Sequence, residues 1–277
     1  MSLASADDIE LARHRSGEGP RLLFIIGSGS TVEESELLVS ILSRHFDLLT
    51  YDHRGLGQSG VVTHPYDMAT CAADALVVLD AEGWEQAGVV GLSFGGMVAQ
   101  ELAVTHPGRV SRLALLCTSS GGPGGSSFPL HELEDLTPEE RDGRRLRLMD
   151  TRFDDAWMAS HPADRRLVDL LAGRNADLDE ERRVGVRRQL EARRHHDVWD
   201  RLSAIDCPTL VAAGRFDGIA PLANSEAIAS RIDGAELRIY EGGHAFLAQD
   251  RDSLPEIIGF MAADDVSTDP TKENNPR

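Results

Sequence analysis

A serine between two glycines is the clearest chemical signal in the chain, in the run Gly91-Leu92-Ser93-Phe94-Gly95. An apolar stretch over residues 87–92 precedes the serine, and a stretch with helical spacing over residues 94–106 follows it. A tight turn from a strand into a helix forces such a serine into a strained backbone conformation and projects its hydroxyl group outward. We therefore predict that Ser93 is a nucleophile at a helix start, where partial positive charge favours a developing anion.

The residues that would activate this serine follow two later apolar runs. A serine hydroxyl needs a general base, and His244 comes directly after the paired glycines 242–243 and the apolar run 235–240. None of the other histidines in the sequence follows a late strand with glycines before it. A histidine base in turn needs a carboxylate that holds its tautomer and stabilises the imidazolium. Asp217, in the turn after the apolar run 208–213, is the best candidate for this acid.

The acid has one rival position in the sequence. Residues 117–120, at the end of the preceding apolar run, contain no carboxylate. Asp206, Asp233 and Asp250 lie at the ends of elements away from the predicted catalytic edge, so we expect their replacement by asparagine to cost little. The chain order serine, aspartate, histidine is that of hydrolases built on such a serine turn, and it differs from the orders of the main serine protease families.

Two backbone N–H groups should bind the negative oxygen of a tetrahedral intermediate. We assign one to Phe94, directly after the nucleophile, and the other to Ser28 in the turn Gly27-Ser28-Gly29, which follows the apolar run 21–26. Backbone donors place few demands on side chains, so these two oxyanion-hole assignments rest on position along the chain.

Apolar runs typical of buried strands alternate with helical patterns, which predicts an α/β fold with a mostly parallel central sheet flanked by helices. The predicted strands cover residues 21–26, 46–52, 87–92, 110–118, 208–214 and 235–240. The predicted helices cover residues 34–44, 65–83, 94–106, 221–232 and 247–262.

Residues 120–200 interrupt this alternation. The stretch opens with a flexible glycine-rich loop and continues with helical patterns dense in Arg, Asp and Glu. We predict a hydrolase core over 1–119 and 201–263, a helical lid over 120–200 and a disordered tail over 264–277. An independent helical domain is the alternative to a lid. The lid arginines could grip an anionic substrate, but interleaved acids favour a salt-bridged surface.

The composition argues against several classes of function. The formal net charge of −18 and the pI of about 4.9 should repel nucleic acid and anionic membranes. The N-terminus shows no signal peptide, and no apolar run reaches the ~18 residues of a membrane helix. Cys71, Cys117 and Cys207 lack metal-binding spacing, so we expect reduced, buried thiols in a cytoplasmic protein with neither metal nor cofactor. A homo-oligomer is left open.

The run Tyr51–Gly60 (YDHRGLGQSG), together with the serine turn and the segments carrying the acid and the base, resembles the α/β-hydrolase superfamily. Within it the chain is similar to small bacterial serine esterases, including aclacinomycin methylesterase-like proteins and 3-oxoadipate enol-lactonases. The resemblance implies a cofactor-free acyl-enzyme mechanism. Ile26 departs from it, since many members have a histidine there. Residues 121–124 (GGPG) resemble the oxyanion loop of prolyl aminopeptidases but follow a different strand, so we interpret them as a hinge to the lid.

These features predict a serine hydrolase that cleaves an ester or lactone of a small organic molecule. The same three residues support C–C bond hydrolysis, amide cleavage and perhydrolysis, and a non-catalytic ligand receptor on this fold is the alternative outside enzymes. Haloalkane dehalogenases and most epoxide hydrolases of the fold use an aspartate nucleophile, so Ser93 argues against both.

Overall fold

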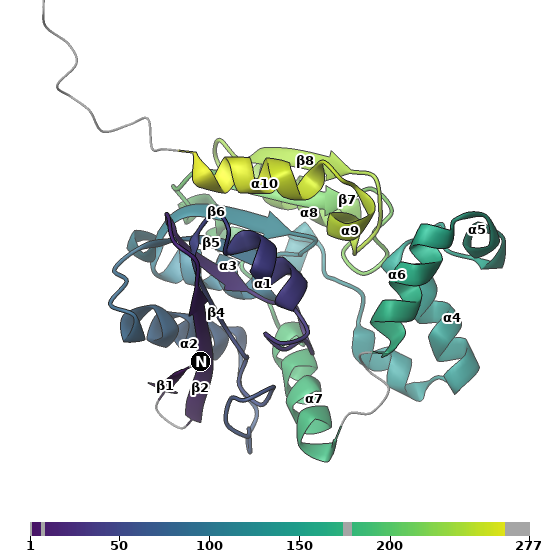
Figure 1. Cartoon of the computed structure of the whole chain (residues 1–277), viewed down its shortest axis with the longest axis horizontal. Helices are drawn as coiled ribbons and strands as arrows, with labels where there is room; N and C mark the ends of the chain where they lie inside the picture. The colour runs from purple at the N-terminus through teal and green to yellow at the C-terminus, as the bar shows by residue number, and fades with distance from the viewer. Residues whose placement is uncertain (1, 7–8, 174–178, 264–277) are drawn as a thin grey trace, which may run out of the picture.

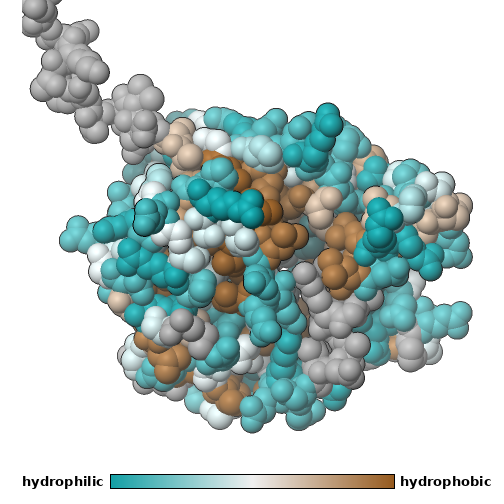
Figure 2. Space-filling model, in the orientation of Figure 1, coloured by the Kyte–Doolittle hydropathy of each residue, from teal (hydrophilic) through white to brown (hydrophobic). Residues whose placement is uncertain are grey.

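The computed structural model describes residues 2–6, 9–173 and 179–263 of the chain. The tail predicted to be disordered, 264–277, lies outside these residues. A single twisted sheet runs through the molecule with helices on either side, and a group of further helices extends to one side of it (Figure 1). Figure 2 shows hydrophilic side chains over most of the same face, with apolar surface gathered near its centre.

The sheet has the strand order β1-β2-β4-β3-β5-β6-β7-β8. Its strands are β1 (Ser2–Ala6), β2 (Ile9–Ser16), β3 (Arg21–Ile25), β4 (Asp47–Tyr51), β5 (Ala87–Leu92), β6 (Val110–Leu116), β7 (Thr209–Gly214) and β8 (Glu236–Tyr240). The strands from β3 to β8 are parallel to one another, whereas β1 and β2 form an antiparallel pair at one edge. The structure therefore confirms the predicted α/β fold with a mostly parallel sheet.

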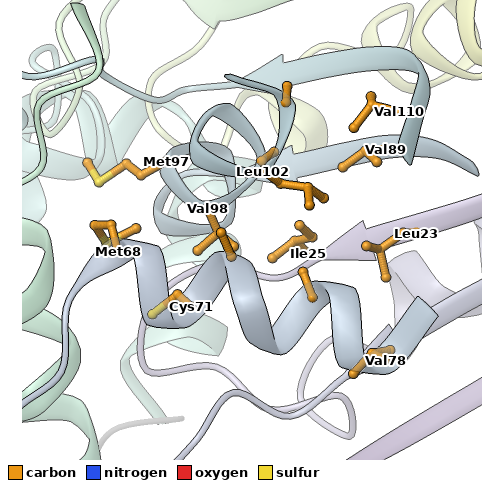
Figure 3. Close-up of a cluster of buried hydrophobic side chains, with 14 of the residues drawn as sticks. Leu23, Ile25, Met68, Cys71, Val78, Val89, Met97, Val98, Leu102 and Val110 are labelled. Carbon is orange, nitrogen blue, oxygen red and sulfur yellow. The ribbon is translucent and has the colours of Figure 1, made fainter. Parts of the chain in front are cut away.

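Two layers of helices cover the sheet. One contains α2 (Met68–Ala81), α3 (Phe94–Thr105) and α8 (Leu222–Arg231), and the other contains α1 (Glu36–Leu42), α9 (Phe246–Gln249) and α10 (Ser253–Ala262). Because side chains alternate along a strand, Leu23 and Ile25 of β3 pack with the first layer, whereas Leu22 and Phe24 pack with the second. Figure 3 shows the first of these two cores, where side chains of α2 and α3 meet those of the strands.

The structure differs from the predicted elements in three places. The antiparallel pair of β1 and β2 was not predicted. The helix predicted over 65–83 begins at Met68, because the Asp67 side chain accepts a hydrogen bond from the N–H of Thr70 and caps it. The helix predicted over 247–262 is two helices, α9 and α10. Their break is stabilised at Asp250, whose carbonyl oxygen accepts a hydrogen bond from the Ser253 hydroxyl.

The chain between β6 and β7 holds four α-helices among its described residues and no strand. They are α4 (Pro138–Met149), α5 (Asp155–Ser160), α6 (Pro162–Gly173) and α7 (Glu180–Arg194). Short 3-10 turns cover Gly122–Gly124, Leu130–Asp135 and Trp199–Ala204, and another, Pro107–Arg109, precedes β6. We call residues 120–200 the inserted segment; its role as a lid remains a prediction.

The glycine-rich loop that opens the inserted segment is folded back on itself and against the segment's end. The N–H of Gly121 donates to the carbonyl oxygen of Gly125 at 3.1 Å, and the N–H of Val198 donates to that of Ser120 at 2.9 Å. The two ends of the inserted segment therefore meet beside the sheet.

The structure also bears on membrane-spanning helices and on the three cysteines. None of the helices in the described ranges is both long enough and apolar enough to cross a membrane. All three cysteines are free thiols, with Cys71 and Cys117 buried as expected and Cys207 half-buried.

A buried ion pair joins the loop after β4 to helix α2. The guanidinium of Arg54 donates to both carboxylate oxygens of Asp74 at 2.7 and 2.6 Å, and the two side chains are 7% and 3% exposed. Removing one partner of such a pair leaves an uncompensated charge inside the protein. We therefore expect Asp74→Asn to lower the free energy of unfolding by about 3–5 kcal/mol in chemical denaturation.

The matched control for this substitution is Asp80→Asn on the same helix. The Asp80 carboxylate is 65% exposed and pairs with Arg109, and an exposed pair contributes about 0–1 kcal/mol. Equal losses in the two variants would show that burial of the Arg54–Asp74 pair does not matter to stability.

Candidate active site

Ser93 lies at the turn between β5 and α3, as predicted, and is half-buried. Its φ and ψ are 54° and −111°, a region that non-glycine residues rarely adopt. The N–H of Ser93 donates to the carbonyl oxygen of Leu116 at 2.8 Å, which fixes the turn to the neighbouring strand. A Cβ atom at Gly95 would lie 2.1 Å from the carbonyl oxygen of Ile25, so glycine is required there. Local sterics therefore hold the Ser93 hydroxyl at the end of the sheet.

The structure brings all three predicted residues together. Nε2 of His244 lies 3.0 Å from Oγ of Ser93, and Nδ1 of His244 lies 2.7 Å from Oδ2 of Asp217. The Asp217 side chain is fully buried, and its Oδ1 accepts hydrogen bonds from the N–H groups of Ile219 and Ala220 at 2.7 and 2.8 Å. This arrangement leaves Oδ2 of Asp217 aimed at the histidine, and it is the geometry that activates a serine nucleophile.

The surroundings of His244 favour its protonated form. Burial opposes protonation, but the Asp217 carboxylate and, beside it, the Cys117 thiol shift the balance, so the pKa of His244 is raised well above its usual value. The C-terminus of α4 lies against the same residue, because the N–H of His244 donates to the carbonyl oxygen of Met149 at 2.6 Å. A helix C-terminus carries partial negative charge. Both features stabilise the imidazolium that a proton transfer from Ser93 would form.

Cys117 was not predicted as part of the site. It follows β6 with a φ of 41°, and its sulfur, a carboxylate oxygen of Asp217 and a ring nitrogen of His244 all lie within 4.8 Å of one another. These three atom types can bind a metal ion, and the described ranges hold no other such group of three. Three separate loops supply the residues, so spacing along the chain could not reveal the group.

The loop assigned to the oxyanion hole lies against Ser93. A Cβ atom at Gly27 would lie 3.8 Å from Cβ of Ser93. Helix α7 fixes the far side of this loop, where the N–H of Gly29 donates to Oε1 of Gln189 at 2.8 Å. The N–H groups of Ser28 and Phe94 have no hydrogen-bond acceptor within the described ranges, so both are available to a ligand. Their role in catalysis remains a prediction.

His53 supports both sides of this predicted oxyanion hole, and its role was not predicted. Its Nε2 lies 3.0 Å from the carbonyl oxygen of Ile26, the residue before the Gly27 turn, and its ring packs edge-on against Phe94 at 5.2 Å. Burial lowers the pKa of His53 to about 4. The ring is therefore neutral near pH 7, and its Nε2–H donates to the Ile26 carbonyl oxygen.

The neutral state of His53 predicts a loss of stability in acid. Above pH 6.5 the ring is neutral in both folded and unfolded protein, so it contributes no pH dependence. As the pH falls from 6.5 toward about 4, the unfolded chain binds a proton that the folded protein excludes. The free energy of unfolding should then fall by about 1.4 kcal/mol per pH unit for each such histidine.

Urea unfolding between pH 7 and 4.5 tests this expectation. His53→Gln should reduce the pH slope by one proton, whereas His45→Gln, at an exposed position, should leave it unchanged. An unaltered slope in His53→Gln would show that His53 is protonated in the folded protein.

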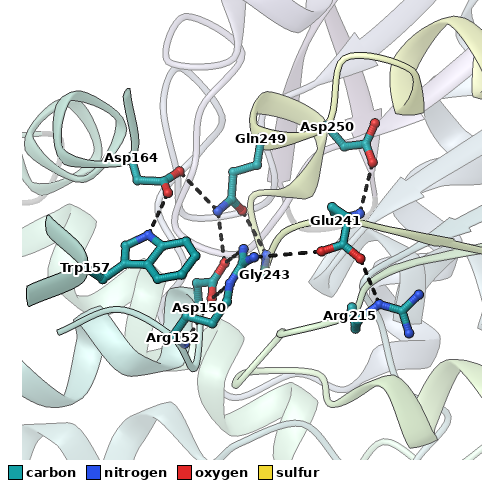
Figure 4. Close-up of polar contacts among 9 residues, drawn as sticks. All are labelled: Asp150, Arg152, Trp157, Asp164, Arg215, Glu241, Gly243, Gln249 and Asp250. Atoms are coloured by element: carbon teal, nitrogen blue, oxygen red, sulfur yellow. Dashed lines mark hydrogen bonds and ion pairs between the residues drawn. The ribbon is translucent and has the colours of Figure 1, made fainter. Parts of the chain in front are cut away.

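A polar network connects the inserted segment to the loop that carries His244 (Figure 4). Asp150 is the C-cap residue of α4, and its fully buried carboxylate pairs with Arg152 and accepts a hydrogen bond from Nε2 of Gln249 at 3.0 Å. Oε1 of Gln249 accepts a hydrogen bond from the N–H of Gly243 at 2.8 Å. Gln249 thus bridges the end of α4 to the residue directly before His244, a tertiary link that no local pattern indicates.

We expect Gln249→Leu to lower turnover by about tenfold to a hundredfold, because displacements near 1 Å have effects of this size. KM should change little, since Gln249 does not lie against the Ser93 hydroxyl. The measurement is kcat and KM on an activated ester, with Arg251→Gln, a change at a 94% exposed side chain, as control. A rise in KM at constant kcat would instead place Gln249 in substrate binding.

Comparisons with known proteins agree with this fold. The model of the alpha/beta hydrolase fold family matches residues 20–250. A protein named "Putative carbamate hydrolase RutD" from Caulobacter sp. (strain K31) is 31% identical over 237 residues, which cover 81% of this chain and 84% of that protein. The chain therefore belongs to the α/β-hydrolase fold family and is a hydrolase.

Two solved structures are similar over nearly the whole chain. A hydrolase from Pseudomonas aeruginosa PA01 has a TM-score of 0.75 and 30% identity, covering 95% of this chain and 98% of that one. The enol-lactonase from Burkholderia xenovorans LB400 has a TM-score of 0.77 and 24% identity, covering 95% and 100%. Because the enol-lactonase is only 24% identical to this chain, its similarity concerns the fold alone.

Proposed function

We propose that this hydrolase cleaves an ester or lactone bond of a small organic substrate through an acyl-enzyme intermediate. The observation that carries the proposal is the unbroken hydrogen-bond chain from Asp217 through His244 to the Ser93 hydroxyl, whose backbone is held in a strained turn. The buried carboxylate and the raised pKa of His244 support the proton transfer that the reaction needs.

The proposed reaction has two halves. Oγ of Ser93 attacks the substrate carbonyl carbon while Nε2 of His244 takes its proton, and the N–H groups of Ser28 and Phe94 bind the oxyanion. His244 then protonates the leaving alcohol, which departs and leaves an acyl group on Ser93. A water molecule that gives its proton to His244 attacks this ester, and the acid leaves as Ser93 regains its proton.

Carbamate or amide cleavage is the second candidate. The name of the Caulobacter relative at 31% identity favours it, and the same three residues can attack either carbonyl. The two candidates differ in the group that leaves, which is an alcohol from an ester and an amine from an amide. C–C bond hydrolysis and perhydrolysis use the same residues, and a ligand receptor would leave them unused.

Active-site labelling with a fluorophosphonate separates an enzyme from a receptor. We expect a covalent adduct on the peptide that contains Ser93, blocked by prior denaturation. A panel of esters, lactones, carbamates and amides of matched size then ranks the reaction types by kcat/KM. No adduct on Ser93 in the folded protein would overturn the acyl-enzyme proposal, and a preference for carbamates would favour the second candidate.

We further propose a cytoplasmic location and a freely diffusing small-molecule substrate. Three free thiols support a reducing compartment, and the net charge of −18 argues against nucleic acid as a partner. Cell fractionation with an antibody against the chain tests the location.

A further inference from the structure

A pocket of about 200 Å³ lies between the loop after β6 and the C-terminal end of α7. Its wall includes Met97, one helical turn after Ser93, and Ser119. The residue before Ser119 is Thr118, whose hydroxyl donates to the carbonyl oxygen of Ser93 at 2.8 Å. The pocket is therefore next to the nucleophile turn, although neither Ser93 nor His244 forms part of its wall.

Helix α7 connects the pocket to the predicted oxyanion hole. Gln189 on this helix accepts the hydrogen bond from Gly29, and Arg193, four residues later, lines the pocket. Residues four apart lie on one face of a helix, separated by about 6 Å along its axis. A substrate bound at Ser93 could therefore extend one of its ends to Arg193.

The charge of the pocket wall is opposite to that of the protein. The chain has 46 acidic and 28 basic residues, yet the wall contains two arginines, Arg193 and Arg194, and no acidic residue. A pocket of this sign in so acidic a protein favours an anionic ligand.

Arg193 has no acidic partner, unlike several other arginines on or near helix α7. Arg182 pairs with Glu34, Arg188 with Glu191 and Arg201 with Glu101, whereas Arg193 forms no ion pair with any described residue. Its side chain donates to the carbonyl oxygen of Phe128 at 3.1 Å. Burial without a counter-charge lowers the pKa of Arg193 to about 10, so the guanidinium is still charged near pH 7. An unpaired cation that is partly withdrawn from water is costly unless a ligand supplies the anion.

Two buried side chains near Arg193 have polar atoms without a hydrogen-bond partner. His196 lines the pocket and is 7% exposed; its ring comes near the backbone of Ser119, but neither ring nitrogen makes a hydrogen bond of good geometry with a described residue. Nε2 of Gln189, a fully buried side chain, likewise has no acceptor within the described ranges. Buried polar atoms without partners are few in folded proteins. His196 lies in the pocket wall with the unpaired Arg193, and the two together indicate a site for a polar ligand; Gln189 lies one helical turn before Arg193 and outside the wall.

We propose that this pocket binds a carboxylate group of the substrate, with Arg193 as its counter-charge and His196 as a neutral hydrogen-bond donor. This inference rests on the proposed ester hydrolysis and narrows its substrates. The preferred substrates are esters or lactones whose acyl part carries a carboxylate several bonds from the reacting carbonyl. The small volume of the pocket fits one such group better than an extended chain.

The test compares two substrates that differ in one charged group, monomethyl adipate and methyl hexanoate, with proton release followed by pH-stat. Arg193→Gln should lower kcat/KM for monomethyl adipate by about tenfold to a hundredfold, the range for a hydrogen bond to a charged group. It should change kcat/KM for methyl hexanoate less than twofold. Arg193→Lys should restore part of the preference, and Arg187→Gln, an exposed position on the same helix, should alter neither value.

Isothermal titration calorimetry measures the binding of adipate and so tests the carboxylate site without relying on catalysis. Adipate should bind the wild-type protein and bind Arg193→Gln at least tenfold more weakly, while the thermal midpoint of Arg193→Gln stays equal or rises because an unpaired cation is removed. If adipate binding depends on Arg193 but no ester is hydrolysed, the proposed function is contradicted and the carboxylate site is supported. Equal losses on both esters, equal adipate affinity in the two proteins, or no adipate binding would overturn the site.

Discussion

Ser93→Ala should lower the turnover of an activated ester by about 10³-fold or more, the scale of loss when a nucleophile acting with a histidine is removed. Its hydroxyl lies 3.0 Å from Nε2 of His244 and donates its hydrogen bond to that nitrogen. Alanine removes this oxygen and fits the same turn, since the backbone contacts of Ser93 to Leu116, Gly96 and Thr118 do not involve its side chain. The measurement is kcat on one ester at saturating concentration.

Circular dichroism and the thermal midpoint establish whether the Ser93→Ala protein is folded. Ser230→Ala, an exposed serine on α8, is the matched control and should keep full turnover. If Ser93→Ala stays folded and retains activity within tenfold of the wild type, another group must attack the substrate, and the fluorophosphonate adduct would have to be sought elsewhere.

Asp217→Asn should produce the largest loss, about 10⁴-fold in turnover, with the fold retained. Oδ1 of Asp217 already accepts two backbone hydrogen bonds, so the asparagine oxygen will take that place and its NH₂ group will face Nδ1 of His244. The ring must then carry its proton on Nε2, and it can no longer accept the proton of Ser93. The variant also removes the charge that stabilises the imidazolium.

Asp206→Asn and Asp233→Asn are the controls for this substitution, since both side chains are exposed. The structure corrects our expectation for Asp250→Asn: Oδ2 of Asp250 accepts the N–H of Glu241 at 2.9 Å, in the loop that leads to His244. That variant is therefore not a neutral control. Retention of more than a tenth of wild-type turnover by Asp217→Asn would show that the acid lies elsewhere.

The parallel part of the sheet could be predicted because its central strands are mostly apolar runs buried on both faces, such as Leu22–Ile25. The antiparallel pair at the edge could not. Its buried side chains in β1 are Ala4 and Ala6, small residues that leave little apolar signal, and its position depends on pairing with β4, which is distant in the sequence.

The positions of Ser93, Asp217 and His244 could be predicted for a different reason. Each follows a parallel strand, and the carboxyl ends of such strands meet at one edge of the sheet. Cys117, His53 and Gln249 act through contacts between distant segments. A thiol at the end of β6, a neutral ring under Ile26 and an amide bridging two loops have no periodicity or spacing that would single them out.

The end of helix α4 limits how the inserted segment of this hydrolase can be exchanged. The carbonyl oxygens of Leu148 and Met149, which have no partner inside their own helix, accept the N–H groups of Gly218 and His244. A Cβ atom at Gly243 would lie 1.9 Å from the Met149 oxygen, so the contact tolerates no side chain.

Replacing the inserted segment, residues 120–200, by that of a relative would therefore change more than the segment itself. The graft would also remove the backbone acceptors that hold the loops of Asp217 and His244, so a chimera should lose rate as well as change selectivity. Recombination breakpoints placed after Thr151 keep these acceptors, because they leave the end of α4 with the core. A graft of that kind must also keep Gln189 of helix α7, which holds the Gly29 loop.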